Sequence, residues 1–335
     1  MIQIPDNCLS EIFENLDGLS LSSCILVCRI WRQISVTILW RSIWKIETFI
    51  TCLPDESKDN LRRNEIPVPR GTPFFNYALF CKKFSFCDIQ GRLEFFLNRR
   101  HSASSTISMD QKISVLSHEF LNLLMNNVSL NMLDLLHSKT NITNFASLFR
   151  VNNFLQNVKE LYCESYYVSG FYSELFQVCH NVQSLDLILQ HSITNTNDLA
   201  NFLSGQRNLN YLEIWQFDVL EDQDIILRSI PNSIIELGLS VLGLVNLRSI
   251  IGNLNNLRVL KLSILNKYDY YGIETLDFPH LKVLKFLHAD TAPTEEFIYM
   301  FLARHGNKLT EIRIDNISQS LRNNININWP NVIVK

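Results

Sequence analysis

One short pattern, apolar-x-x-apolar-x-apolar, recurs along most of this chain and constrains its fold more than any other feature. Its copies begin at Cys81, Leu130, Val158, Val182, Leu209, Ile234, Leu257, Leu281, Leu309 and Trp329. From residue 130 onward successive copies start 20 to 28 residues apart. A regular spacing in this range predicts an array of stacked units rather than one globular core.

Stretches with the apolar period of a helix lie between the copies, at 116–124, 145–155, 171–179, 196–203 and 293–302. Short strands that alternate with helices predict a parallel sheet with helices outside it. The three apolar side chains of one copy contribute roughly 5–9 kcal/mol when buried. Ordering some two dozen residues costs about 1–2 kcal/mol each, so one unit cannot fold alone. Pattern and spacing resemble those of leucine-rich repeats, and this resemblance implies an α/β solenoid over 79–335, with parallel strands on its concave face and helices on its convex face.

Two segments depart from this regularity. The copies at residues 81 and 130 are about two periods apart, so 87–129 holds either a degenerate repeat or an insertion. We expect a degenerate repeat near 104–109. Residues 46–78, rich in proline, predict a helix and an irregular connector that form an N-terminal cap.

The first 45 residues are dense in large apolar side chains. Leu9, Ile12, Phe13 and Leu16 follow the period of one helical face. We expect Ser20 to cap a second helix that buries Leu21, Cys24, Ile25 and Cys28, and a third helix from Trp31 to Trp40. Leu26, Val27, Ile30 and Trp44 are then left over. A segment of this size buries too little surface by itself, which indicates a docking face for a partner.

The order Ile4-Pro5, Ile12-Phe13-x-x-Leu16, Val27-Cys28-x-x-Trp31 and Leu39-Trp40-Arg41 resembles the F-box. In that family the module binds the Skp-type adaptor of cullin-RING ubiquitin ligases. The resemblance implies an F-box over 1–45 and places these residues at or near the adaptor interface: Pro5, Leu9, Ile12, Leu16, Val27, Cys28 and Trp31. Asn7-Cys8 stands where the family usually has an acidic residue and an aliphatic one. The alternative is an ordinary helical cap on the domain that follows.

Alternate residues of a strand point to opposite sides, so the residues between the framework positions should line the concave face. The predicted substrate-binding residues on this face are Glu160, Tyr162, Asp186, Tyr211, Glu213, Trp215, Lys261 and Lys285. The same alternation also places Glu164 there. Tyr and Trp on a rigid surface are good interface anchors. Our hypothesis is that Tyr162, Tyr211 and Trp215 contact a partner whose basic segment lies near the acidic residues. The alternative is a solvated face, with binding left to loops.

Composition narrows the class of function. The net charge of -3 is near neutral and of mixed sign, which favours neither nucleic acid nor an anionic membrane surface as partner. No apolar run approaches the roughly 20 residues that cross a bilayer. The eight cysteines contain no CxxC and no zinc spacing, and no N-terminal signal pattern is present, which favours the reducing cytoplasm or nucleus. No nucleotide, hydrolase or metalloprotease motif is found, so we expect no catalytic residues, no cofactor and no metal site.

The sequence therefore predicts the substrate-recognition subunit of a Skp–cullin–F-box ubiquitin ligase, a binding protein rather than an enzyme. Its expected partners are a Skp-type adaptor, through it a cullin, and a protein substrate. Two alternatives remain: an interaction scaffold without a ligase role, and an F-box protein that binds the adaptor but delivers no substrate.

Overall fold

The computed structural model describes residues 4–99, 106–136, 154–165, 170–190, 196–216, 223–241, 251–264, 272–287, 293–315 and 317–335. The chain forms two compact units. The first comprises residues 1–139 and 149–158, and the second comprises residues 140–148 and 159–335.

The first unit begins with a small helical head, residues 4–45. Its helices are α1 (Asp6–Glu14), α2 (Gly18–Cys24) and α3 (Arg29–Leu39), so three helices are confirmed. Cys28, expected on the buried side of the second helix, lies after that helix has ended and is exposed. They bury a small core of Leu9, Phe13, Leu21 and Cys24. Asp17, not Ser20, caps α2: the Asp17 carboxylate accepts a hydrogen bond of 2.7 Å from the backbone N–H of Ser20. Aspartate at this position satisfies an N–H group that has no partner within the helix.

The rest of the first unit contains the following elements: α4 (Ile46–Thr51), α5 (Asp55–Arg63), η1 (Tyr77–Phe80), β1 (Lys83–Ser85), α6 (Phe86–Asn98), α7 (Met109–Asn127) and β2 (Met132–Asp134). The segment 46–78 therefore holds two α-helices where one was predicted. The chain then forms a short parallel pair of strands, β1 and β2.

Residues 87–129, which separate the first two copies of the repeat, form an insertion of helices. Phe84 of β1 pairs directly with Leu133 of β2, so no strand lies between them. The expected degenerate repeat near 104–109 is wrong for its described part, residues 106–109, and residues 104–105 lie outside the described residues. The physical reason is a capping box: Ser108 and Gln111 bond each other's backbone N–H groups and begin α7.

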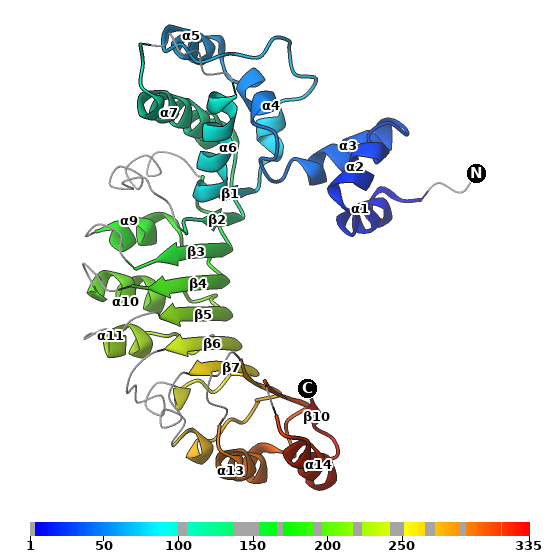
Figure 1. Ribbon diagram of the computed structural model, residues 1–335, viewed down its shortest axis with the longest axis vertical. Helices are drawn as coiled ribbons and strands as arrows, with labels where there is room; N and C mark the ends of the chain where they lie inside the picture. The colour runs from blue at the N-terminus through cyan, green and yellow to red at the C-terminus, as the bar shows by residue number, and fades with distance from the viewer. Residues whose placement is uncertain are drawn as a thin grey trace. The chain divides into compact units, whose positions relative to one another are not determined.

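The second unit is an array of strands and helices. In chain order its elements are β3 (Glu160–Glu164), α9 (Phe171–Val178), β4 (Ser184–Leu189), α10 (Thr196–Gly205), β5 (Tyr211–Gln216), α11 (Gln223–Arg228), β6 (Glu236–Val241), β7 (Val259–Ile264), η4 (Ile273–Thr275), β8 (Val283–Phe286), α13 (Glu295–His305), β9 (Glu311–Ile314), α14 (Gln319–Asn328) and β10 (Ile333–Val334). Each strand from β3 to β10 pairs in parallel with the next. Figure 1 shows β3 to β7 in chain order, with α9, α10 and α11 along one side of the sheet.

The framework residues of the repeat form ladders across this sheet. The strand register aligns one residue from each strand, in the series Leu161, Leu185, Leu212, Leu237, Leu260, Leu284 and Ile312. Every member is buried. A second buried ladder runs in the same order through Cys163, Leu187, Ile214, Leu239, Leu262, Phe286 and Ile314. Each strand thus covers its neighbour's apolar side chains, as the burial argument from sequence required.

The predicted class, a helical head followed by an α/β solenoid, is confirmed, and the parallel sheet fits the predicted repeats. Sequence reasoning named neither α11 nor α14. The last predicted helix, α13, begins at Glu295 behind a Thr294 cap, rather than at Pro293. The predicted helix at 145–155 falls almost entirely outside the described residues.

Candidate functional site

The head exposes several large apolar side chains. Leu26 is 81% exposed, Val27 is 60% exposed and Ile12 is 50% exposed. Leu26 and Val27 lie in the turn between α2 and α3, and Ile12 lies in the middle of α1. Burying three such side chains against a partner would contribute roughly 5–9 kcal/mol before the costs of association. Of the four apolar residues predicted to be left over, Leu26, Val27 and Trp44 are exposed, whereas Ile30 packs against the core of the head.

The seven predicted adaptor residues divide into two groups. Pro5, Ile12, Val27 and Cys28 are exposed, whereas Leu9, Leu16 and Trp31 pack within the head. Leu9 is only 5% exposed, and the Trp31 ring meets the Phe13 ring edge-on with centroids 5.0 Å apart. The first group is placed to touch a partner directly, and the second group shapes the surface that carries it. Their role in adaptor binding stays a prediction.

The second candidate surface is the face of the sheet in the second unit that points away from the buried ladders, here called the open face. The register aligns one row of it in the order Tyr162, Asp186, Glu213, Gly238, Lys261, Lys285 and Arg313. A neighbouring row begins with Glu160, Ser184, Tyr211 and Glu236. All eight predicted substrate-binding residues are half-buried side chains of this face. Glu164, predicted on the exposed face, is a correction: it is 1% exposed, and the Gln190 side chain donates a hydrogen bond of 3.1 Å to its carboxylate.

A polar network ties the centre of the open face together. Lys261 Nζ lies 2.7 Å from a carboxylate oxygen of Glu236 and 3.5 Å from one of Glu213. The Tyr211 hydroxyl donates to Glu213, and the Lys261 ammonium lies 5.0 Å from the centroid of the Tyr211 ring. Although burial lowers the pKa of Lys261, its two carboxylate partners outweigh that effect and raise the pKa above its usual value. The network therefore holds the Tyr211 ring in one orientation.

Asp186, next to this network, carries a charge that the fold does not compensate. Burial and the nearby Glu213 carboxylate raise the pKa of Asp186 to about 6, against the opposing effect of Lys261. Within the described part of the chain its buried Oδ1 atom has no hydrogen-bond partner. A carboxylate kept in such surroundings is a candidate functional group.

Replacing Asp186 by asparagine is expected to stabilise the protein at neutral pH. Between about pH 4 and pH 6 the folded state holds the Asp186 proton and the unfolded state does not, so the free energy of unfolding falls as the pH rises through this window. Asparagine does not ionise, so the variant keeps the free energy of unfolding that the wild type loses in this window. Thermal unfolding should give Asp186→Asn a higher Tm than the wild type at pH 7.5, and the same Tm near pH 4. A variant less stable than the wild type at pH 7.5 would contradict this account of Asp186.

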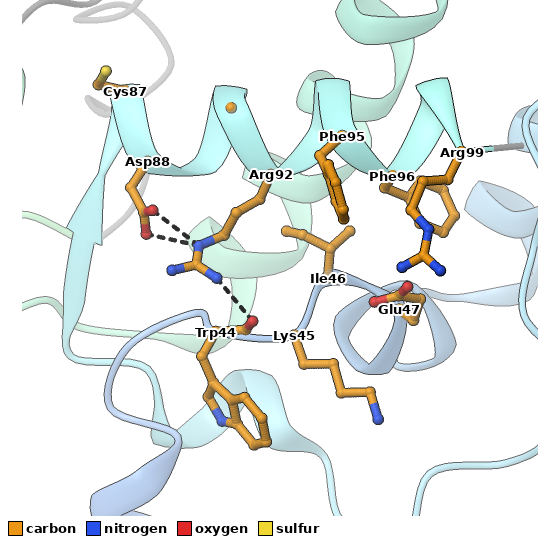
Figure 2. A pocket seen from close by; sticks show the side chains of 11 residues that line it. Trp44, Lys45, Ile46, Glu47, Cys87, Asp88, Arg92, Phe95, Phe96 and Arg99 are labelled. Carbon is orange, nitrogen blue, oxygen red and sulfur yellow. Dashed lines mark hydrogen bonds and ion pairs between the residues drawn. The ribbon is translucent and has the colours of Figure 1, made fainter. Parts of the chain in front are cut away.

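A cavity of about 470 Å³ lies in the first unit, between α6 and the segment that leads into α4 (Figure 2). Arg92 crosses it: its Nε donates to Asp88 at 2.9 Å and its Nη1 donates to the carbonyl oxygen of Trp44 at 2.9 Å. In Figure 2 the side chains of Trp44 and Lys45 point away from α6, and Ile46 points toward it. These contacts attach the segment to α6, so we read the Arg92 charge as structural.

The described residues offer little catalytic chemistry. Among them no group of three or more His, Cys, Asp or Glu side chains is placed to hold a metal ion. None of the helices described is both long enough and apolar enough to span a bilayer. All eight cysteines are free, and burial raises the pKa of Cys81 and of Cys179 to about 12, which keeps these two thiols protonated and unreactive.

Two features of the open face were missed by sequence reasoning. Glu236 was not among the predicted binding residues, yet it is the nearest carboxylate partner of Lys261. Gly238 was not among them either, although it lines a hollow between its neighbours. The signal for both was available in the repeat: aligning the copies pairs Glu236 with Val259, two residues before Lys261, and places Gly238 between Glu213 and Lys261.

Comparison with known proteins identifies the head. Residues 1–45 match the model of the F-box-like family. No curated protein matches the chain. F-box domains are in general non-catalytic modules that bind Skp-type adaptors, so this match indicates an adaptor role in ubiquitin ligation in general terms.

Proposed function

We propose that this chain is the substrate-recognition subunit of a Skp–cullin–F-box ubiquitin ligase. In this proposal the head docks on the Skp-type adaptor and the open face of the solenoid holds a protein substrate. The observation that carries the proposal is the exposed apolar surface of an F-box-like head, since large apolar patches mark interaction sites. The free cysteines support a reducing compartment, cytoplasm or nucleus.

The proposed mechanism is proximity. The chain itself makes and breaks no bond and needs no cofactor. Binding of head and solenoid to different partners converts ubiquitin transfer to the substrate into a reaction within one assembly, which raises the effective concentration of substrate lysines near the ubiquitin-loaded enzyme. The open face supplies the rigid surface for this: its aromatic side chains are held by the strands and by the Tyr211–Glu213–Lys261 network.

Co-purification with a matched deletion tests the proposal. The full chain and a variant lacking residues 1–45 are isolated from cells, and bound adaptor, cullin and other proteins are quantified by mass spectrometry. We expect the full chain to bring down adaptor and cullin. The deletion should lose both, keep the substrate, and lengthen the substrate's half-life.

Other outcomes distinguish the alternatives. A full chain that binds neither adaptor nor cullin would be an interaction scaffold whose head only caps the next domain. A full chain that binds adaptor, while every captured protein keeps its half-life after the deletion, would act outside a ligase. Either result contradicts the proposed function.

A further inference from the structure

The open face contains a small hollow with one glycine at its centre. The hollow has a volume of about 170 Å³, and these residues line it: Glu213, Trp215, Gly238, Leu239, Ser240, Lys261, Leu262, Ser263 and Leu287. Three adjacent strands, β5, β6 and β7, supply all of them but Leu287, which follows β8. The hollow therefore belongs to the second unit alone.

Gly238 lines this hollow and leaves room for the Glu213 side chain to lie over the strand. Its neighbours in the row, Glu213 and Lys261, carry long side chains, whereas Gly238 carries none. A Cβ atom at residue 238 would lie 2.9 Å from Cγ of Glu213, closer than such atoms approach in real proteins. Glycine inside a strand weakens it, and it often marks a place where another molecule approaches the backbone.

The hollow suits an apolar side chain. Its charged rim is already satisfied, because Glu213 and Lys261 pair with each other. Apolar and small residues form the rest of the lining: Trp215, Gly238, Leu239, Ser240, Leu262, Ser263 and Leu287. An apolar cavity of about 150 Å³ in another protein holds a benzene molecule, so about 170 Å³ is enough for a phenyl ring or a branched aliphatic side chain.

Charges of opposite sign flank the hollow at equal distances. Asp186 lies two strands from Gly238 on one side, and Lys285 lies two strands from it on the other. Strands are about 4.8 Å apart, so each charge is about 10 Å from the hollow along the row. Neither Asp186 nor Lys285 forms an ion pair among the described residues, although Lys261 acts electrostatically on Asp186 and Lys285 acts on Glu311. Each is a half-buried side chain of the open face, so a ligand of opposite charge can pair with it.

An extended protein segment matches this spacing. In the polyproline II conformation residues i and i+3 lie on the same side, about 9 Å apart. We propose that the substrate presents an extended segment that places an apolar side chain in the hollow at Gly238, a basic residue three positions away at Asp186, and an acidic residue three positions away in the other direction at Lys285. This inference rests on the proposed function and adds the chemistry of the substrate to it.

The test uses the full chain and a library of random 12-residue peptides displayed on phage. Peptides selected on the wild type should share an apolar residue with Lys or Arg three positions to one side and Asp or Glu three positions to the other. A synthetic peptide of the consensus is then titrated by fluorescence anisotropy.

Ser263→Leu fills the hollow and should weaken binding of this peptide at least tenfold, whereas Ser263→Ala, the matched control, should bind it within twofold of the wild type. Lys285→Glu should weaken the same peptide and improve binding of a peptide whose acidic residue is replaced by lysine.

Each outcome decides one level of the proposal. Suppose that the selected peptides lose binding to Tyr211→Ala but bind Ser263→Leu as tightly as the wild type. This result would show that the hollow does not hold a peptide side chain, while the open face still binds the peptide. A consensus without flanking charges would overturn the role of Asp186 and Lys285. Peptides that are insensitive to all of these variants, or no selected peptides, would remove the open face as a peptide site. Co-purification with the adaptor would be unaffected by any of these results, and it tests the ligase role separately. Circular dichroism and a thermal melt verify that each variant is folded.

Discussion

Replacing Ile12 and Val27 together by aspartate is expected to weaken binding of the chain to a Skp-type adaptor by at least 100-fold. Both side chains are half-exposed or more, and neither is part of the head's core. An interface that covers them gains roughly 1.5–3 kcal/mol of binding free energy from each side chain. A carboxylate in the same place loses this contribution, and its desolvation costs further binding free energy. A tenfold change in affinity corresponds to about 1.4 kcal/mol, so two substitutions exceed the stated factor. Isothermal titration with purified adaptor measures it.

The matched control is Ile327→Asp. Ile327 is an exposed isoleucine of α14, in the second unit, and its replacement should leave adaptor binding unchanged. Trp31→Ala is a less direct test, because Trp31 packs on Phe13 and its loss would also loosen the head. If the double aspartate variant is folded and binds the adaptor as the wild type does, the docking surface is not the one described here.

Replacing Tyr211 and Trp215 together by alanine is expected to abolish capture of the substrate. Both rings lie on the open face, on the two sides of Glu213 along β5. Aromatic anchors of this kind commonly lose 2 kcal/mol or more when truncated to alanine, so two of them account for roughly a thousandfold in affinity. The measurement is quantitative affinity capture of the proteins that the wild type binds and whose half-life depends on residues 1–45.

A second aromatic pair of the same composition provides the control. The rings of Tyr299 and Trp329 pack at a tilt of 31° with centroids 6.4 Å apart, and both are half-buried outside the open face. Alanine at these two positions should reduce stability without reducing capture by the folded protein. Unchanged capture by Tyr211→Ala with Trp215→Ala would show that loops, rather than the open face, hold the substrate.

Sequence was sufficient for the parts of this fold that repeat. The apolar frames predicted each strand from β3 to β9, because a parallel strand covered on one face by helices needs apolar residues at alternate positions. The register ladder of Leu185, Leu212 and Leu237 is the direct consequence. The sequence could also identify the head, where Leu26 and Val27 had no place in so small a core.

What escaped prediction depends on contacts between segments that are distant in sequence. The sequence predicted a helix at 116–124, within α7, but not α6, and only the direct pairing of β1 with β2 shows that 87–129 is an insertion. The burial of Glu164 depends on Gln190, in the next repeat. The raised pKa of Asp186 results from its burial and from the Glu213 carboxylate one strand away, against the opposing effect of Lys261. Alternation along one strand predicts which way a side chain points, but not how the neighbouring strands shift its pKa.

The register of the sheet has an evolutionary consequence. Each strand contributes separate residues to the buried ladders and to the outward rows, so a substitution in an outward row leaves the packing behind it intact. New binding preferences can therefore arise one position at a time, without a compensating change in the interior. A duplicated copy of this gene would be free to acquire a different target while it keeps the same scaffold and the same attachment to the rest of its machinery.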